Sequence, residues 1–273
     1  RTRQVVLNAP RVVYVTSRFL QKRYPHRSFA GLGGNLLGGA VMHSSKLKDA
    51  ALGCDPASAT ADVLECSNVL VESPPSSLLA GRLSRTAAAA HVLRLGMIGS
   101  LTTASKGTRT VLKALSLLMR HTREWEFRHL GVGDNKSYVD YARALGIAEH
   151  VHFDGVLTHD KVLAWLDEID LYLQPSRQEG LPRALIEAMS RGCPAIGSTA
   201  GGIPELLEPG CLHAPGDANR LARLIEKAMA DSRWMAEQAR RNFEISRKYE
   251  QKILLAKRDA FFQRFVDDAV NDI

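Results

Sequence analysis

From residue 92 onward, short apolar runs alternate regularly with amphipathic segments, and this alternation restricts the fold more than any other feature of the chain. The predicted strands are residues 92–98, 125–132, 150–153, 169–174, 194–198 and 211–213. The predicted helices are residues 108–121, 137–145, 159–166, 182–191, 203–207 and 219–229. Strands that alternate with helices predict parallel pairing, because a parallel strand needs a long crossover connection. The predicted fold class is α/β, a Rossmann-like parallel sheet with helices on both faces.

The segments that flank this sheet carry weaker patterns. Residues 231–268 are rich in Ala, Arg, Lys, Glu and Gln with intermittent aromatic residues, which predicts two or three helices with a break near Ser246. Apolar residues 12–15 predict a buried strand, and residues 17–23 predict a short helix. Residues 26–65 are rich in Gly, Ala and Ser, so they are interpreted as an inserted loop or a partly disordered segment.

The fourth predicted strand runs into Ser-Arg-Gln-Glu-Gly-Leu-Pro-Arg-Ala-Leu-Ile-Glu-Ala-Met, residues 176–189. This segment places Glu179 and Glu187 eight residues apart across a junction between a strand and a helix. Open α/β sheets bind ligands at such junctions, because strand carboxyl ends and helix amino ends converge there. Pro182 suits the first helical position, where its missing N–H costs nothing, so we expect Glu179 in the turn and Glu187 inside the helix.

The spacing of these residues matches the dimensions of a nucleotide. At about 1.5 Å of rise per residue, Glu187 lies roughly 7 Å along the helix from Pro182, close to the offset between a diphosphate and its ribose. The N–H groups near Gly180 and Leu181 could hold the anion while Glu187 accepts hydrogen bonds from ribose hydroxyls. The alternative is that Glu187 is a solvated helix residue and Glu179 a charge favoured by the helix dipole.

Residues 179–189, together with Gly-Gly-Ile-Pro-Glu at residues 201–205, resemble the donor-binding signature of retaining GT-B glycosyltransferases of family 4. The resemblance implies a C-terminal donor-binding domain, a truncated N-terminal domain before it, and last helices that cross back onto that first domain. The expected parts are a remnant of the N-terminal acceptor domain (1–91), the nucleotide-sugar-binding domain (92–248) and the C-terminal crossing helix (249–273).

The resemblance also gives a role to the segment after the first strand of the donor-binding domain. In the family, a lysine at the position of Lys106 reaches the donor diphosphate, and an arginine usually does so at the position of Ser100. A serine cannot neutralise phosphate charge, so Arg183 and Arg177 are candidate substitutes. The alternative for Lys106 is an ordinary lysine at a helix start, although a cation is unfavourable at a helix amino end.

The family resemblance also implies roles for residues at the nucleotide end and at the sugar end of the donor. Gly133 would let the backbone approach the nucleotide closely. Main-chain groups of Val156 and Leu157 would hold the nucleobase, and Glu179 would lie against the transferred sugar. The expected donor-binding residues are Ser100, Lys106, Gly133, Val156, Leu157, Gly180, Leu181, Pro182, Arg183 and Glu187. The expected catalytic residues are Glu179 and Lys106.

The function implied by the resemblance is retaining transfer of a hexose from a UDP- or GDP-linked donor to a glycan or lipid-linked acceptor in surface polysaccharide synthesis. Lys106 and the helix amino end would stabilise the leaving diphosphate electrostatically. This scheme needs no cofactor and no metal, and no DxD-like cluster stands in a suitable loop. Two alternatives stay open: a catalytically incomplete sugar-nucleotide-binding module, and a GT-B-fold epimerase or phosphorylase.

The part of the chain before residue 92 is short for an acceptor domain. It supplies only one convincing strand and one helix, and neither His26 nor His43 matches the context of the family's catalytic histidine. The chain also begins at Arg1, which suggests a fragment or a processed form. Because proximity and orientation can contribute roughly 7–11 kcal/mol, we expect this chain alone to bind a sugar nucleotide but to transfer no sugar.

The excess of positive charge is confined to the N-terminal third, since residues 1–94 hold 12 Lys and Arg against 5 Asp and Glu, whereas the rest holds 24 of each. Arg18, Lys22, Arg23 and Arg27 would suit an anionic membrane surface or a phosphorylated acceptor. A solvated charged face is the plainer alternative, and the lack of interleaved aromatic residues argues against nucleic acid.

Cysteine usage and hydropathy bear on the compartment. The four cysteines form no CxxC pair and no metal-ligand spacing, which indicates a reducing compartment. No apolar run is long enough to span a bilayer. We therefore expect a cytoplasmic location, either free or at the inner face of the membrane.

Overall fold

The structure is a computed structural model that describes residues 12–14, 19, 63–67, 69, 71–87, 92–118 and 124–271. The chain forms two compact units. The smaller unit contains residues 1–68 and 254–273, and the larger unit contains residues 69–253.

The boundaries of these units differ from those at residues 91 and 248 that the sequence led us to expect. Val71 pairs with Glu250 in an isolated parallel bridge. The helix that follows, α3 (Ser76–Ala87), packs against α10 (Ser232–Ser246). These contacts attach residues 69–91 to the larger unit.

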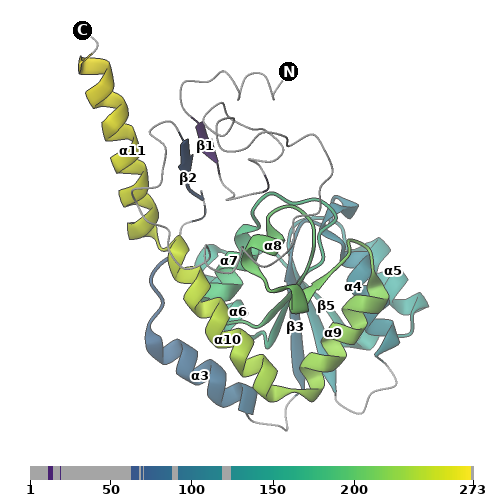
Figure 1. Cartoon of the computed structure of the whole chain (residues 1–273). Helices are drawn as coiled ribbons and strands as arrows, with labels where there is room; N and C mark the ends of the chain where they lie inside the picture. The colour runs from purple at the N-terminus through teal and green to yellow at the C-terminus, as the bar shows by residue number, and fades with distance from the viewer. Residues whose placement is uncertain are drawn as a thin grey trace, which may run out of the picture. The chain divides into compact units, whose positions relative to one another are not determined.

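A six-stranded parallel sheet forms the centre of the larger unit, in the order β5-β4-β3-β6-β7-β8 (Figure 1). The strands are β3 (Leu93–Ile98), β4 (Trp125–Leu130), β5 (Val151–Gly155), β6 (Leu171–Gln174), β7 (Ala195–Ser198) and β8 (Leu212–His213). The chain starts at β3, adds β4 and β5 on one side, and then crosses to β6, β7 and β8 on the other. The strand order therefore reverses between β3 and β6, which is where open α/β sheets bind ligands.

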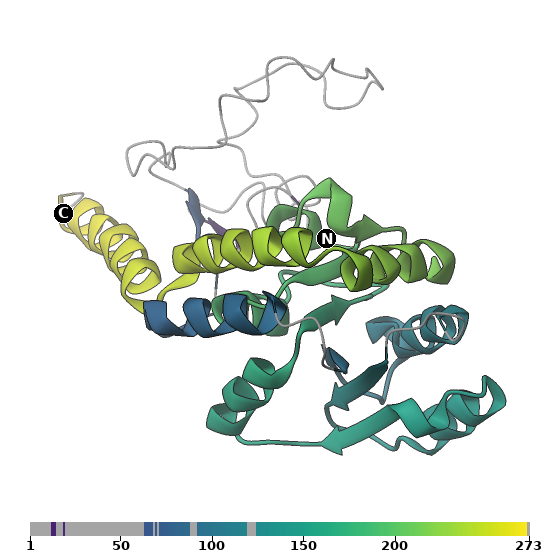
Figure 2. The same ribbon diagram turned by 90° about the horizontal axis from the view of Figure 1, so that it is seen from below.

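Helices lie on both faces of this sheet (Figure 2). Besides α3 and α10 they are α4 (Thr108–Leu117), α5 (Lys136–Ala144), α6 (His159–Glu168), α7 (Arg183–Ser190), α8 (Ile203–Leu206) and α9 (Ala218–Ala230). Four short 3-10 helices are η3 (Ala104–Lys106), η4 (Ala148–His150), η5 (Pro209–Cys211) and η6 (Arg247–Tyr249). Helix α4 packs against α9, and α7 packs against α10. The predicted fold class is confirmed, and the predicted strands and helices of the sheet domain differ from the observed ones only at their ends.

One such difference is at the start of α7, in the segment that carries Glu179 and Glu187. Helix α7 begins at Arg183, and Pro182 is its N-cap with a ψ of 112°. The expectation that Pro182 takes the first helical position is therefore wrong by one residue. The proline ring restricts φ but leaves ψ open, so Pro182 can adopt the extended conformation typical of a residue just outside a helix. Glu179 lies in the turn and Glu187 inside the helix, as expected.

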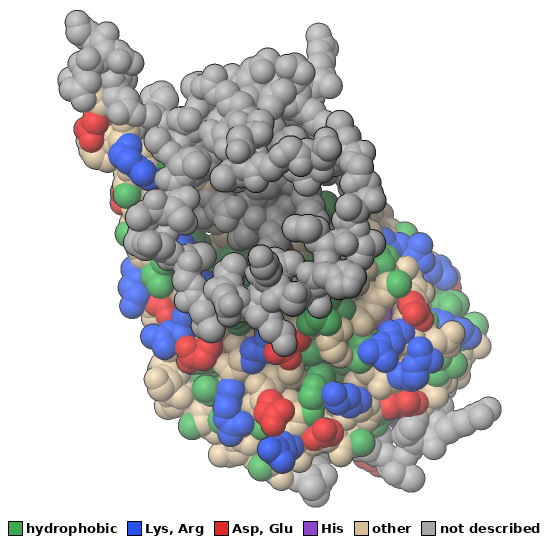
Figure 3. Space-filling view, in the orientation of Figure 1, with side chains coloured by type: hydrophobic (Ala, Val, Ile, Leu, Met, Phe, Trp, Pro, Cys, Tyr) green, Lys and Arg blue, Asp and Glu red, His purple; other side chains and the backbone are tan. Residues whose placement is uncertain are grey.

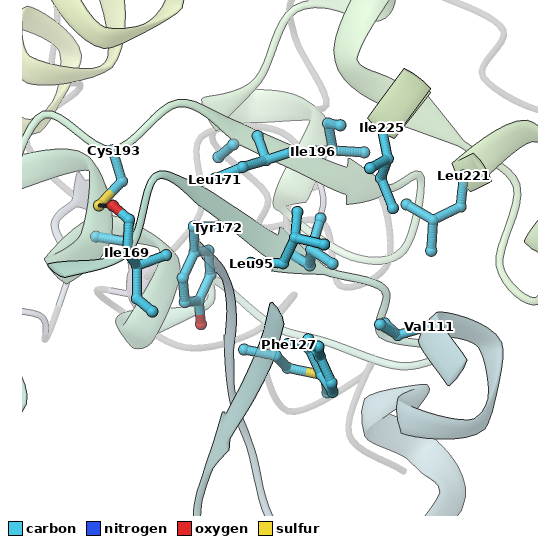
Figure 4. Close-up of a cluster of buried hydrophobic side chains, with 14 of the residues drawn as sticks. Leu95, Val111, Phe127, Ile169, Leu171, Tyr172, Cys193, Ile196, Leu221 and Ile225 are labelled. Atoms are coloured by element: carbon cyan, nitrogen blue, oxygen red, sulfur yellow. Dashed lines mark hydrogen bonds between the residues drawn. The ribbon is translucent and has the colours of Figure 1, made fainter. Parts of the chain in front are cut away.

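The core fills both sides of the central strands. Leu95 on β3, Phe127 on β4 and Tyr172 on β6 are fully buried. In Figure 4 these side chains lie among aliphatic residues contributed by neighbouring strands and helices. Every residue of β6 and β7 is buried, as expected of parallel strands that are covered on both faces.

Helix α3 was not predicted, and a buried arginine anchors it. The guanidinium of Arg82 donates hydrogen bonds to the carbonyl oxygens of Ile169, of Leu166 at 2.9 Å and of Arg191 at 3.1 Å. These carbonyls lie at the carboxyl ends of α6 and α7, where a helix has no partners of its own for them. Arg85 adds an ion pair with Asp170 at 3.0 Å.

The smaller unit contains a second, two-stranded parallel sheet. Strand β1 (Val12–Tyr14) pairs with β2 (Val63–Glu65), which lies in the stretch interpreted as a loop or a partly disordered segment. Helix α11 (Gln251–Asn271) begins after the break predicted near Ser246. Its Leu254 oxygen accepts a hydrogen bond from Cys66 Sγ at 3.7 Å. Both residues belong to the smaller unit, so this bond joins its N-terminal and C-terminal segments.

Several expectations fall outside the described residues. Of the helix predicted at residues 17–23, only Phe19 is described, and it is helical. The residues considered in the sequence analysis that lie outside the described part of the chain include Arg18, Lys22, Arg23, His26, Arg27, His43 and Cys54.

Three loops at the carboxyl edge of the sheet pack backbone against backbone. A Cβ atom on Gly107, whose φ is +81°, would lie 2.3 Å from the carbonyl oxygen of Pro175. A Cβ atom on Gly201, with φ of +59°, would lie 2.1 Å from the carbonyl oxygen of Glu179. The loops after β3, β6 and β7 can approach this closely only because glycine has no side chain.

We predict that Gly107→Ala lowers the free energy of unfolding by several times as much as Gly146→Ala. Both glycines have a left-handed φ, of +81° and +72°, but nothing lies within 4 Å of a Cβ atom on Gly146. The control therefore measures the left-handed penalty of about 1–2 kcal/mol alone, whereas Gly107→Ala adds a backbone clash. Urea denaturation compares the two, and equal losses would contradict the close approach.

A second prediction concerns pH. His129 on β4 is buried, and no described group bonds its Nδ1 atom. Burial lowers the pKa of His129 from 6.5 to about 4, against a smaller opposing effect of Asp154. Between pH 4 and pH 6.5 the unfolded state binds more protons at His129 than the folded state does. The contribution of neutral, buried His129 to the free energy of unfolding is therefore complete above pH 6.5 and decreases as the pH falls toward 4.

Acidification from pH 7 to pH 4 should therefore destabilise the wild type by about 3 kcal/mol more than it destabilises His129→Leu, at 1.36 kcal/mol per pKa unit. Urea denaturation at several pH values measures both proteins. His213, whose pKa burial also lowers, is present in both and cancels. Parallel pH profiles of the two proteins would show that His129 does not titrate in this way.

Candidate functional site

An ion pair joins the two loops that flank the reversal of strand order. Lys106 follows β3 and Glu179 follows β6, and the distance from Lys106 Nζ to Glu179 Oε2 is 2.9 Å. The side chains are 29% and 12% exposed. Lys106 is the last residue of η3 and directly precedes Gly107, the N-cap of α4. The structure therefore brings the two expected catalytic residues together at the edge where ligands bind.

Two further side chains, which the sequence analysis missed, hold the carboxylate of Glu179. Ser176 Oγ donates to Glu179 Oε2 at 3.0 Å, and Gln174 Nε2 donates to the same oxygen at 3.3 Å. Gln174 Nε2 also donates to Ser176 Oγ at 2.9 Å. Both residues are buried. The signal available in the sequence is polar residues at alternate positions at the end of an otherwise apolar strand.

Tyr172 continues this polar chain into the core. Its hydroxyl donates to Gln174 Oε1 at 3.2 Å and accepts from the N–H of Ile98 at 3.4 Å. Burial raises the pKa of Tyr172, and the negative charges of Glu187 and Glu179 add to this effect. The phenol therefore stays protonated and able to donate.

The loop after β7 holds the backbone of the turn that contains Glu179. The N–H of Gly202 donates to the carbonyl oxygen of Gly180 at 2.7 Å. Ser198 Oγ donates to the carbonyl oxygen of Ser176 at 2.5 Å, and the N–H of Ala200 donates to Ser198 Oγ at 3.2 Å. Residues 198–202 of this loop therefore hold the backbone of the turn in place through hydrogen bonds.

Helix α7 begins four residues after Glu179, so its amino end follows this turn directly. Its N-cap, Pro182, provides no side-chain hydrogen bond. Among the described hydrogen bonds, none uses the N–H of Gly180 or Leu181. A helix amino end with unused N–H groups attracts anions.

Glu187, the fifth residue of α7, is nearly buried but weakly paired. Its side chain is 12% exposed, and within the described part of the chain its one ion pair is with Arg183 Nη2 at 3.9 Å. Glu187 also lines a cavity of about 180 Å³ together with Pro74, His159 and Leu163. A carboxylate in this position can accept further hydrogen bonds from a ligand.

The cations considered as substitutes at Ser100 lie in different places. Ser100 Oγ contacts Thr102 Oγ1 at 2.7 Å. The side chain of Arg183 is 69% exposed, and its Nη2 atom lies 3.9 Å from Glu187 Oε1. The guanidinium of Arg177 lies against Gly216, with Nη2 only 3.1 Å from a Cβ position there. Arg183 is therefore the cation beside the amino end of α7, whereas Arg177 turns toward the loop after β8.

The residues expected near the nucleotide lie at the ends of β4 and β5. Gly133 has a φ of +125°, and a Cβ atom there would lie 2.9 Å from Leu101 Cβ, so its close approach is to the loop after β3. Val156, after β5, is 70% exposed, and Leu157 packs partly against the core. An exposed apolar side chain beside two loop backbones offers one surface for a flat ring.

Lys and Arg side chains intermingle with Asp and Glu side chains on the face seen in Figure 3. Among the described residues, no group of three or more His, Cys, Asp or Glu is placed to hold a metal ion. None of the described helices is long and apolar enough to cross a membrane.

Comparison with curated proteins finds relatives that match part of the chain. Protein CapJ of Staphylococcus aureus is 30% identical over 152 residues, which cover 55% of this chain and 39% of that protein. The amylovoran biosynthesis glycosyltransferase AmsK of Erwinia amylovora is 34% identical over 143 residues, which cover 49% of this chain and 35% of that protein. The chain thus spans well under half the length of these relatives.

Solved structures share the fold at low sequence identity. The C-terminal domain of a glycosyl transferase group 1 family protein (LpcC) from Francisella tularensis aligns with a TM-score of 0.55 at 18% identity, over 66% of this chain and 99% of that chain. HepE from Anabaena, in complex with UDP and glucose, aligns with a TM-score of 0.65 at 18% identity, over 97% of this chain and 65% of that chain.

A family model described as glycosyl transferases group 1 matches residues 93–231, just over half of the 273 residues and nearly all of the larger unit's sheet. The matched region includes both signature segments, residues 176–189 and 201–205. The resemblance inferred from these segments is therefore confirmed, and this chain belongs to the glycosyl transferases group 1, with the α/β fold of GT-B enzymes.

Proposed function

We propose that this chain is the donor-binding part of a retaining hexosyltransferase that uses a UDP- or GDP-linked sugar to build a surface polysaccharide. The observation that carries the proposal is the pairing of Lys106 with Glu179 at the strand reversal, beside the uncapped amino end of α7. Two similarities support it. AmsK is named for amylovoran biosynthesis, and the structure of HepE is a complex with UDP and glucose.

In this proposal the diphosphate lies at the amino end of α7, between the N–H groups of Gly180 and Leu181 and the ammonium of Lys106. Glu187 accepts hydrogen bonds from the ribose hydroxyls. The nucleobase lies against Val156 and Leu157. Arg183 is the second cation near the phosphates, at the end of the site where Ser100 supplies no charge.

The chemistry of such a site is the stabilisation of charge. As the glycosidic bond breaks, the sugar becomes oxocarbenium-like and negative charge accumulates on the diphosphate. Lys106 and the amino end of α7 are positioned to stabilise that charge, which is often the largest catalytic effect. Glu179 lies against the sugar, and the scheme uses neither a metal nor a cofactor.

The acceptor and the place of the reaction are also proposals. A glycan or lipid-linked acceptor suits the polysaccharide and lipopolysaccharide synthesis for which several relatives are named. A cytoplasmic site, free or at the inner face of the membrane, agrees with the free thiols of Cys66, Cys193 and Cys211 among the described cysteines.

Calorimetry with UDP and uridine, and with GDP and guanosine, tests the assignment of the nucleotide. Lys106→Ala should weaken binding of the diphosphate far more than binding of the nucleoside, because its charge acts on phosphate alone. Glu187→Gln should weaken both ligands by about 1.5–3 kcal/mol, the scale for hydrogen bonds to a charged group.

The exposed residues Lys113 on α4 and Glu237 on α10 provide matched controls. Lys113→Ala and Glu237→Gln should leave both affinities unchanged. Equal losses for diphosphate and nucleoside in Lys106→Ala would make Lys106 a structural residue. If the wild type binds neither UDP nor GDP, the proposed function is wrong.

A further inference from the structure

The polar chain behind Glu179 has a fixed direction. The carboxylate of Glu179 only accepts, so the amide nitrogen of Gln174 faces Glu179 and Ser176, and the amide oxygen accepts from the hydroxyl of Tyr172. With the amide reversed, Gln174 Oε1 would face Glu179 Oε2 at the same 3.3 Å, and two acceptors would oppose each other. The orientation of Gln174 therefore follows from Glu179, and the hydroxyl of Tyr172 donates to the amide oxygen on the other side.

The donors of this chain converge on one oxygen of Glu179. Lys106 Nζ, Ser176 Oγ and Gln174 Nε2 all contact Oε2, at 2.9, 3.0 and 3.3 Å. Among the described contacts, none reaches Oε1. A carboxylate can accept about four hydrogen bonds, so one oxygen is saturated and the other is available. Because the side chain is 12% exposed, the available oxygen can meet a ligand.

We propose that Gln174, whose Oε1 accepts a hydrogen bond from Tyr172, is a positioning residue that holds Glu179 with Oε2 bound and Oε1 presented to a hydroxyl group of the donor sugar. Gln174 touches neither nucleotide nor sugar, and acts only through the carboxylate. The inference rests on the proposed function, because Glu179 can read a sugar hydroxyl only if a nucleotide sugar binds here.

This arrangement separates recognition of the nucleotide from recognition of the sugar. The diphosphate interacts with Lys106 and the amino end of α7, whereas the sugar hydroxyl interacts with Glu179 Oε1. Loss of Gln174 leaves the carboxylate free to rotate, and the entropy of ordering it must then be supplied by the ligand. The affinity for a nucleotide sugar should therefore fall while the affinity for the bare nucleotide is unchanged.

The test is calorimetry on the whole chain with two ligand pairs, UDP with UDP-glucose and GDP with GDP-mannose, using the pair that the wild type binds. In Gln174→Leu the nucleotide should bind within about twofold of the wild type, while the nucleotide sugar should bind roughly 5- to 30-fold more weakly. Tyr172→Phe, which removes only the hydroxyl, should also weaken binding of the nucleotide sugar, by a smaller factor.

A matched control is Gln238→Leu, because Gln238 on α10 is also buried and also hydrogen-bonded, to Glu208 at 3.1 Å. Gln238→Leu should change neither the affinity for the nucleotide nor the affinity for the nucleotide sugar. A double-mutant cycle provides the readout that a structural role would not produce. In a Glu179→Ala background, Gln174→Leu should cause no further loss of nucleotide-sugar affinity, because Gln174 acts through Glu179.

The outcomes distinguish the inference from the proposed function. Equal weakening of nucleotide and nucleotide sugar, unchanged binding of both, or additive losses in the double mutant would each overturn the role of Gln174 while nucleotide binding itself is retained. A wild type that binds neither UDP nor GDP would overturn the proposed function, and the inference with it.

Discussion

The close backbone packing of the loops after β3, β6 and β7 determines where Lys106 and Glu179 of the candidate site lie. Gly107 lies against the carbonyl of Pro175, and Gly201 against the carbonyl of Glu179, at distances that leave no room for a Cβ atom. Because these loops leave neighbouring strands on either side of the reversal in strand order, their contact holds Lys106 Nζ 2.9 Å from the carboxylate of Glu179.

This ion pair matters more for binding than for stability. Partly exposed pairs contribute about 0–1 kcal/mol to folding, since water screens them and both side chains lose freedom. Glu179 balances the charge of Lys106, so in the proposed complex a diphosphate would share the ammonium with the carboxylate. Gln174 and Ser176 both donate to Oε2 of Glu179, and in the proposed complex they would keep this carboxylate in place.

The sheet domain could be predicted from the sequence because its signal is local: apolar runs of strand length alternate with amphipathic helices. The meeting of Lys106 and Glu179 could be predicted only through the family resemblance. Helix α3 could not, because three serines and Gly81 weaken its helix signal, and a buried arginine such as Arg82 is explained only by the helix ends that it contacts. The role of Gln174 was missed for the same reason, since its partners are set by strand register.

The central claim is that a sugar nucleotide binds at the carboxyl edge of the sheet, between β3 and β6. Backbone amide chemical shifts of the ¹⁵N-labelled chain, followed during titration with UDP or GDP, test it most directly. The account predicts the largest shifts at Gly180, Leu181 and the loop 99–107, smaller shifts near Val156, and none along the outer helix α10. Shifts confined to α10, or an absence of shifts at Gly180 and Leu181 at saturation, would contradict it.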